Sequence, residues 1–238
     1  MKSRGIRTMK KNRIAAASVL FAALLLSSCG NNPQPEWLND FYNGNYEYRR
    51  STVTIRDGTE DISTVFEGKV ISSPYKEYVR VIEPEQSSWR EAYYYGSGKM
   101  VKALYKSGDQ YTSQPCAHPY PYGYDQDLIF KEDRTEDYNG VSCTVYTTEY
   151  TDDLSNIFRP DAETATISQE YYVDNKTNKL VCVITDLTDL NEKSQAAMHG
   201  FRTDSSIESE SQAREVITEE RLEILFYDDE MNITIPDV

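Results

Sequence analysis

The sequence has 238 residues with 39 acidic and 25 basic side chains, which gives a formal charge of −14. A chain this acidic repels nucleic-acid phosphates and anionic headgroups, so we expect neither as an electrostatic partner. The length suits one domain of ordinary size that can bury a hydrophobic core.

The first 28 residues have the order of a bacterial secretory signal. Six basic and no acidic residues precede the uncharged run from Ile14 to Leu26, and Ser27, Ser28 and Cys29 follow. This run is shorter than the roughly 20 apolar residues that span a bilayer. The step Leu-Ser-Ser-Cys resembles a lipobox, in which the cysteine receives a diacylglycerol before cleavage.

We therefore predict that residues 1–28 are a lipoprotein signal peptide and that Cys29 is lipidated. Acyl chains such as palmitate would anchor the protein at the extracytoplasmic face of the cell membrane. Cleavage would leave 19 basic against 39 acidic residues, so the mature formal charge would be −20. Residues 29–34 are a polar tether, and residues 35–238 form a single domain. The alternative is an ordinary signal peptide with a chance cysteine.

A short helix is predicted directly after the tether. Pro35 opens it, its apolar face carries Trp37, Leu38, Phe41 and Tyr42, and Gly44 follows as its C-cap. The period then changes to two, which is typical of strands.

The first predicted strand carries Tyr46 and Tyr48, then Val53 and Ile55. The apolar positions change from even to odd numbers midway along this strand. We interpret the change as a switch of the inward face of the kind that a β-bulge causes.

Turn residues then separate short runs rich in Val, Ile, Thr and Tyr, which predicts an antiparallel meander. Several runs alternate, and each predicts one apolar sheet face. They are Val141, Cys143 and Val145; Leu180, Cys182 and Ile184; Leu222, Ile224 and Phe226; and Met231, Ile233 and Ile235.

Two further segments are predicted to be helical. Leu154, Ile157 and Phe158 lie in the first, which Pro160 ends. The second covers about residues 189–199, after a Thr188 cap, and is predicted to turn Leu190, Ala197 and Met198 inward.

Besides Cys29, the chain contains Cys116, Cys143 and Cys182. Buried free thiols are the simplest interpretation for a domain of this size. A disulfide between Cys143 and Cys182 is the alternative, because both lie in apolar strand-like runs.

No strong catalytic signature is present, and we predict neither an enzyme nor a cofactor. The sequence has two histidines, His118 and His199, and Cys116-Ala117-His118 matches no zinc spacing. Its acidic pairs lack the alternation of calcium loops, so no metal site is predicted. An envelope hydrolase is the least favoured class.

Tyrosine is abundant, with 19 residues. It suits the wall of a half-wet cavity or an interaction surface, because a large apolar ring carries a hydroxyl that tolerates water. Its preference for strands explains the abundance equally well.

The layout resembles the LolA/LppX-like superfamily of bacterial envelope lipoproteins. The most recognisable pieces are Tyr138-Asn139-Gly140-Val141, Glu170-Tyr171-Tyr172-Val173-Asp174 and the tail Asn232-Ile233-Thr234-Ile235-Pro236. The resemblance implies a mainly β fold, a curved and unclosed antiparallel half-barrel with short helices as a lid. It also implies an acyl chain or another apolar ligand on the concave side.

We therefore expect a membrane-anchored lipoprotein that binds a lipid or other apolar molecule without catalysis. The alternative is an envelope interaction or sensor module that uses a tyrosine-rich surface. The residues expected at the cavity and its lid are Leu154, Ile157, Phe158, Leu190, Met198, Leu222, Ile224 and Phe226.

Overall fold

The computed structural model describes residues 34–56, 58–83, 90–97, 100–117, 128–154, 164–199 and 216–237. The chain divides into two units, Met1–Gln34 and Pro35–Val238, and the described elements all belong to the second. The predicted signal peptide and Cys29 lie outside the described residues. None of the helices in these ranges has the length and apolarity needed to cross a membrane.

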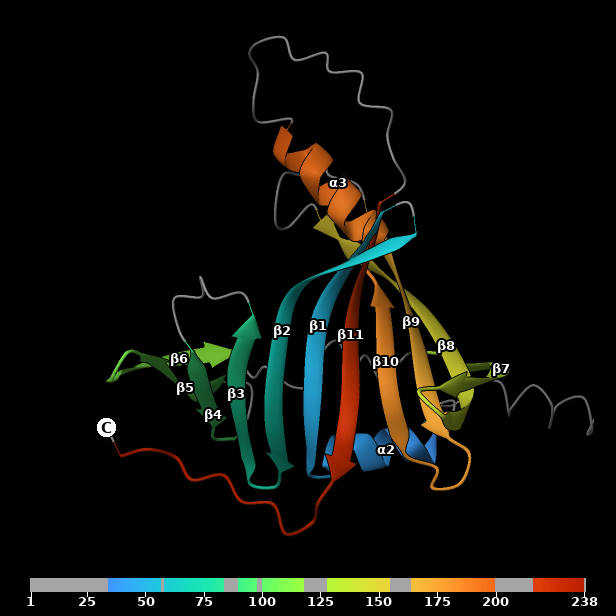
Figure 1. Ribbon diagram of the computed structural model, residues 1–238. Coiled ribbons are helices and arrows are strands. Elements are labelled where there is room, and N and C mark those ends of the chain that lie inside the picture. The colour runs from blue at the N-terminus through green and yellow to red at the C-terminus, as the bar shows by residue number, and fades with distance from the viewer. Residues whose placement is uncertain are drawn as a thin grey trace, which may run out of the picture. The chain divides into compact units, whose positions relative to one another are not determined.

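An 11-stranded antiparallel sheet dominates the described part of the chain (Figure 1). Its strands are β1 Tyr46–Arg56, β2 Thr59–Ser72, β3 Tyr75–Glu83, β4 Glu91–Tyr95, β5 Met100–Ser107, β6 Gln110–Ala117, β7 Lys131–Tyr138, β8 Val141–Asp153, β9 Thr164–Asp174, β10 Leu180–Asp186 and β11 Val216–Tyr227. They lie in the order β6-β5-β4-β3-β2-β1-β11-β10-β9-β8-β7. The sheet is not closed, because β6 and β7 are its two edges, and the predicted fold class is confirmed.

The last strand lies in the middle of the sheet, where β11 pairs with both β1 and β10. Both sides of β11 are occupied by these two strands, so a strand that follows β11 cannot pair beside it. The predicted strand through Met231, Ile233 and Ile235 is therefore wrong, and these residues form an extended tail. Ile233 is buried, and its carbonyl accepts a 3.2 Å hydrogen bond from Nζ of Lys76.

Tight turns join neighbouring strands as the sequence predicts. Asn139 and Gly140 link β7 to β8 with φ angles of 52° and 85°. Positive φ at both central residues matches the right-handed twist of a hairpin.

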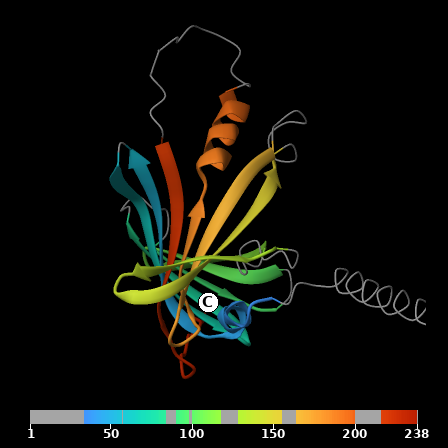
Figure 2. The ribbon, with the colours of Figure 1, turned by 90° about the vertical axis from the view of Figure 1, so that its right-hand side faces the viewer.

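The sheet is curved, and α2 (Glu36–Asn43) packs on its concave face. Trp37, Leu38 and Phe41 are buried there, which confirms the predicted helix and its apolar face. The Trp37 ring lies 5.3 Å from that of Tyr171, and the Phe41 ring lies 5.0 Å from that of Tyr46. Figure 2 shows α2 near one end of the strands.

The predicted change of face in the first strand is present. Tyr46 and Tyr48 are buried near its start, whereas Ser51 and Val53 are buried further along. The extra residue lies in the neighbouring strand, since the β1–β2 register skips Ser63 of β2.

A bulge in β11 corrects the predicted orientation of Phe226. Tyr48 pairs with Ile224 and Glu47 with Phe226, so Leu225 is an extra residue. The alternation shifts by one position, because one inserted residue turns every later side chain to the other face. Ile224 is buried, whereas Phe226 is 48% exposed.

The sequence predicts Leu180, Cys182 and Ile184 on one face of the sheet, but a second bulge, in β10, separates Leu180 from the other two. Leu180 pairs with Val173 and Cys182 with Tyr172, so Val181 is the extra residue. Leu180 and Val173 belong to the concave core, whereas Cys182 and Tyr172 belong to a smaller cluster on the outer face.

The outer cluster contains two free thiols, Cys143 of β8 and Cys182 of β10. Strand β9 lies between them, and two strand spacings amount to about 9.5 Å. A disulfide needs Cα atoms within about 7 Å, so the alternative of a Cys143–Cys182 bridge is wrong.

The second predicted helix is α3 (Thr188–His199), which contacts β9 and β11. In Figure 1 it extends beyond the ends of these strands. Leu190 is half-buried, and the side chain of Met198 lies outside the described residues. In the other excursion Leu154 is buried, whereas Ile157 and Phe158 also lie outside the described residues.

Candidate functional site

Two neighbouring rows of side chains cross five strands on the concave face, and their chemistry differs. The row nearer α2 contains Arg50, Leu222, Val183, Tyr171 and Tyr146, and we call it the apolar row. The next row contains Thr52, Glu220, Thr185, Gln169 and Thr148, and we call it the polar row. The concave face therefore changes from mostly apolar to wholly polar within two residues of each strand.

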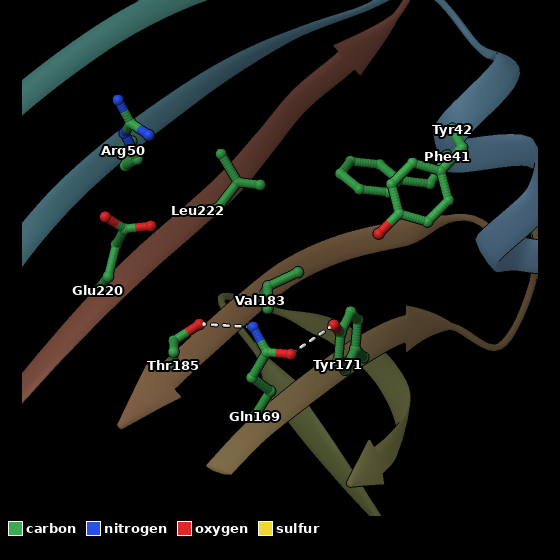
Figure 3. Close-up of a pocket in the computed structure, with 9 residues that line it drawn as sticks. All are labelled: Phe41, Tyr42, Arg50, Gln169, Tyr171, Val183, Thr185, Glu220 and Leu222. Carbon is green, nitrogen blue, oxygen red and sulfur yellow. Dashed lines mark hydrogen bonds between the residues drawn. The ribbon is translucent and has the colours of Figure 1, made fainter. Parts of the chain in front are cut away.

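A cavity of about 50 Å³ lies where these rows meet α2 (Figure 3). Its lining comes from α2, β1, β9, β10 and β11, and consists of Phe41, Tyr42, Arg50, Gln169, Tyr171, Val183, Thr185, Glu220 and Leu222. Figure 3 shows the rings of α2 at one end and Arg50 and Glu220 at the other.

Hydrogen bonds fix the polar side of this cavity. Oη of Tyr171 donates to Oε1 of Gln169 at 2.8 Å, and Nε2 of Gln169 donates to Oγ1 of Thr185 at 3.1 Å. The Gln169 side chain therefore bridges two hydroxyls, accepting from Tyr171 and donating to Thr185. Burial raises the pKa of Tyr171, which keeps its hydroxyl protonated.

Arg50 brings a positive charge to the apolar row. Its guanidinium lies 5.2 Å from the centre of the Phe66 ring, a cation–π geometry. Its charge also acts on Glu77, which is a buried carboxylate of β3 on the same face.

Glu77 is held by two tyrosines. Oη of Tyr48 donates to Oε1 at 2.5 Å, and Oη of Tyr75 donates to Oε2 at 2.6 Å. Burial raises the pKa of the Glu77 carboxyl, while these bonds and Arg50 act in the opposite direction. Both carboxylate oxygens thus have a donor, as a buried charge requires.

Two buried polar atoms of the described side chains have no hydrogen-bond partner in this region. They are Oγ1 of Thr148, in the polar row, and Nε1 of Trp37, on α2. Thr148 is 5% exposed and Trp37 is 2% exposed. An unmade bond at a buried polar group costs about 1–3 kcal/mol.

Of the ligand-binding residues predicted from the sequence, Leu222 lines this cavity. Ile224 lies one row away in the core, and Phe226 points outward. Leu154 and Leu190 are not among the residues that line this cavity. The helix at the cavity is α2, which the sequence predicted as a helix but not as part of the lid.

Sequence reasoning missed the polar members of the cavity, among them Arg50, Gln169 and Glu220. A signal was available, because same-face residues lie two apart in a strand. Gln169 precedes Tyr171 by two positions and Glu220 precedes Leu222 by two. The polar residues of the cavity could therefore have been predicted by counting two positions back from its apolar residues.

A wider open groove of about 310 Å³ lies on the outer face, over β1, β2, β3 and β11. Its charged groups pair with one another, as Lys69 does with Glu47 and Arg80 does with Glu67. The concave cavity is therefore the better candidate, since it combines apolar walls with a few polar groups.

Cys116 of β6 is a half-buried free thiol whose pKa is raised by burial and by Glu77. His118, which follows Cys116 by two positions in the sequence, lies outside the described residues. No three His, Cys, Asp or Glu side chains converge in a metal-binding arrangement within the ranges that the structure describes.

No protein-family model and no curated protein sequence matches the chain. Among solved structures, lipoprotein LppX of Mycobacterium tuberculosis has a TM-score of 0.46 and 11% identity, covering 83% of this chain and 94% of LppX. LprF of Mycobacterium bovis has a TM-score of 0.40 and 10% identity, with coverages of 83% and 91%. An outer membrane lipoprotein-sorting protein domain of Vibrio parahaemolyticus has a TM-score of 0.29 and 8% identity, with coverages of 79% and 87%.

Proposed function

We propose that the protein binds a lipid or another amphiphilic small molecule on the concave face of its sheet, without catalysis. The observation that carries this proposal is the cavity between α2 and the apolar row, bounded by Phe41, Val183 and Leu222. Apolar walls with a few ordered polar groups are the usual composition of a small-molecule site.

Binding would require α2 to move. The cavity of about 50 Å³ is smaller than the roughly 300–1,000 Å³ of typical small-molecule sites. Helix α2 has eight residues, too few to be stable alone, and its position depends on the docking of its apolar face. The buried, unpartnered Nε1 of Trp37 weakens that docking, so α2 is the element that we expect to shift.

We further propose that the protein is anchored through Cys29 at the extracytoplasmic face of the membrane. The Leu-Ser-Ser-Cys step after a basic and apolar leader supports this part. In a Cys29→Ala variant, the protein should leave the membrane fraction or remain unprocessed. Normal processing with unchanged membrane retention would refute the anchor.

A fluorescent fatty acid titration tests the binding proposal. Leu222→Trp should weaken binding at least tenfold, because the larger ring occupies the cavity. Leu225→Trp is the matched control, since Leu225 lies three positions away but is 46% exposed on the outer groove. Equal binding by both variants, with unchanged melting temperatures, would place the ligand elsewhere and overturn the proposal.

A second candidate function is an interaction module. One observation favours it: the rings of Tyr78, Tyr93 and Tyr111 form a half-exposed outer row, with centroids 5.1 Å and 6.3 Å apart. Tyrosine is enriched at interfaces because its ring is apolar and its hydroxyl tolerates water. A protein that binds no fatty acid, but loses a partner on Tyr93→Ser, would support this function instead.

A further inference from the structure

We infer that the ligand of the concave cavity is a single-chain amphiphile whose head is zwitterionic, with a phosphate and an ammonium group. This inference rests on the proposed function and adds the ligand class to it. Three features of the site carry it: the step in polarity between the rows, the placement of two opposite charges, and an unsatisfied hydroxyl.

The step in polarity orients an amphiphile. Phe41, Val183 and Leu222 line the end of the cavity at α2, whereas Thr185 and Gln169 line the end at the polar row. An acyl chain gains free energy where water leaves apolar surface, and a head group keeps its hydrogen bonds only at the polar row. The chain would therefore lie against α2 and the head against the polar row.

Two opposite charges lie at the head-group end. Arg50 pairs across strands with Leu222, and Glu220 is the next concave residue of the same strand, so the two charged residues are in adjacent rows. Figure 3 shows both at the same end of the cavity lining. A singly charged head would be attracted by one of them and repelled by the other. A phosphate near Arg50 and an ammonium near Glu220 would use both, with the guanidinium donating to the phosphate.

The polar row offers an additional hydrogen-bonding group. Thr148 is the cross-strand partner of Gln169, and its buried hydroxyl has no partner. By contrast, the buried Glu77 does not line the cavity, and its two oxygens accept bonds from Tyr48 and Tyr75. Among the described residues that line the cavity, Glu220 supplies the carboxylate that a ligand can contact.

Four dodecyl amphiphiles test the inference, because they share one chain and differ only in the head. They are dodecylphosphocholine, dodecanoate, dodecyltrimethylammonium and dodecyl maltoside, each titrated calorimetrically below its critical micelle concentration. The protein is the full chain with Cys29→Ala, which prevents acylation. Dodecylphosphocholine should bind at least tenfold more tightly than each of the other three.

Variants of Arg50 and Glu220 test whether these two charges cause the expected preference for a zwitterionic head. Arg50→Gln and Glu220→Gln should each weaken dodecylphosphocholine binding about tenfold, the loss of about 1.4 kcal/mol. Arg50→Gln should also reduce dodecanoate binding, and Glu220→Gln should reduce dodecyltrimethylammonium binding. Arg49→Gln is the matched control, because Arg49 adjoins Arg50 but pairs with Glu67 on the outer face.

The outcomes separate the two proposals. Equal or tighter binding of dodecanoate or dodecyl maltoside would overturn the zwitterionic head and leave the binding function intact. Dodecylphosphocholine binding that neither charge variant changes would do the same. If none of the four binds, the proposed function fails and this inference fails with it.

Discussion

The Tyr48 hydroxyl reaches Glu77 across an intervening strand. Tyr48 is in β1 and Glu77 in β3, yet Oη of Tyr48 donates a 2.5 Å hydrogen bond to Oε1 of Glu77. Gly68 of β2 lies beneath the ring, and a Cβ atom there would be 2.3 Å from Cζ of Tyr48. The absent side chain makes room for the phenol, and the phenol satisfies a buried carboxylate.

Gly68→Ala should therefore destabilise the fold, although alanine is otherwise the better residue in a strand. The added methyl displaces the Tyr48 ring and its bond to Glu77. We expect a loss of about 2 kcal/mol in the free energy of unfolding, as for other overpacked cores. Urea denaturation measures it.

The control is a double-mutant cycle with Tyr48→Leu. Once the ring is gone, Gly68→Ala should cost nothing or should stabilise, because glycine in a strand is less favourable than alanine. An equal cost in both backgrounds would show that the ring is not the cause.

Glu77→Gln should gain stability relative to the wild type as pH rises. Burial raises the pKa of Glu77 in the folded state above its ordinary value of 4.5. Between the two pKa values the folded state binds more protons than the unfolded state, so the contribution of Glu77 to stability falls with increasing pH. Urea denaturation from pH 4 to pH 8 follows the difference between the two proteins.

Glu67→Gln provides a control of the opposite sign. Hydrogen bonds from Arg49 and Arg80 lower the pKa of Glu67. Its contribution is present above about pH 4.5 and is lost as pH falls through the folded-state pKa. A difference between wild type and Glu77→Gln that does not vary with pH would refute the raised pKa of Glu77.

Ile224→Asp and Phe226→Asp should have very different effects, although the residues are two positions apart. Ile224 is buried, so an aspartate there loses apolar packing and buries a carboxylate, at a cost above about 3 kcal/mol. Phe226 is exposed, and the same change should cost less than about 1 kcal/mol. Similar losses in thermal melts of both variants would contradict the bulge at Leu225.

Thr148→Val should leave stability unchanged or raise it by about 1 kcal/mol, because it replaces a buried hydroxyl that has no partner with a methyl group. Thr144→Val is the matched control in the same strand. Its hydroxyl donates to Oδ1 of Asn175 at 2.7 Å, so that variant should lose stability. A destabilised Thr148→Val, measured by urea denaturation, would show that the hydroxyl has a partner in solution.

The elements of the fold were predictable where local chemistry determines them. The face of α2 followed from the spacing of Trp37, Leu38 and Phe41, and the hairpin at Asn139 and Gly140 followed from its turn residues. Both signals depend on neighbours within a few residues in the chain.

The orientation of Phe226 and the fate of the tail were not predictable in the same way. A bulge at Leu225 and the central place of β11 arise from pairing with residues far away in the sequence. The candidate site was not predictable for the same reason, because Arg50, Glu220 and Gln169 come together only through the pairing register of separate strands.

The most direct test of the account is native mass spectrometry of the full-length protein purified from its own membranes. The wild type and Leu225→Trp should each carry one non-covalently bound amphiphile, and Leu222→Trp should carry none. Wild-type protein that carries no bound molecule and takes up no added amphiphile would contradict the account.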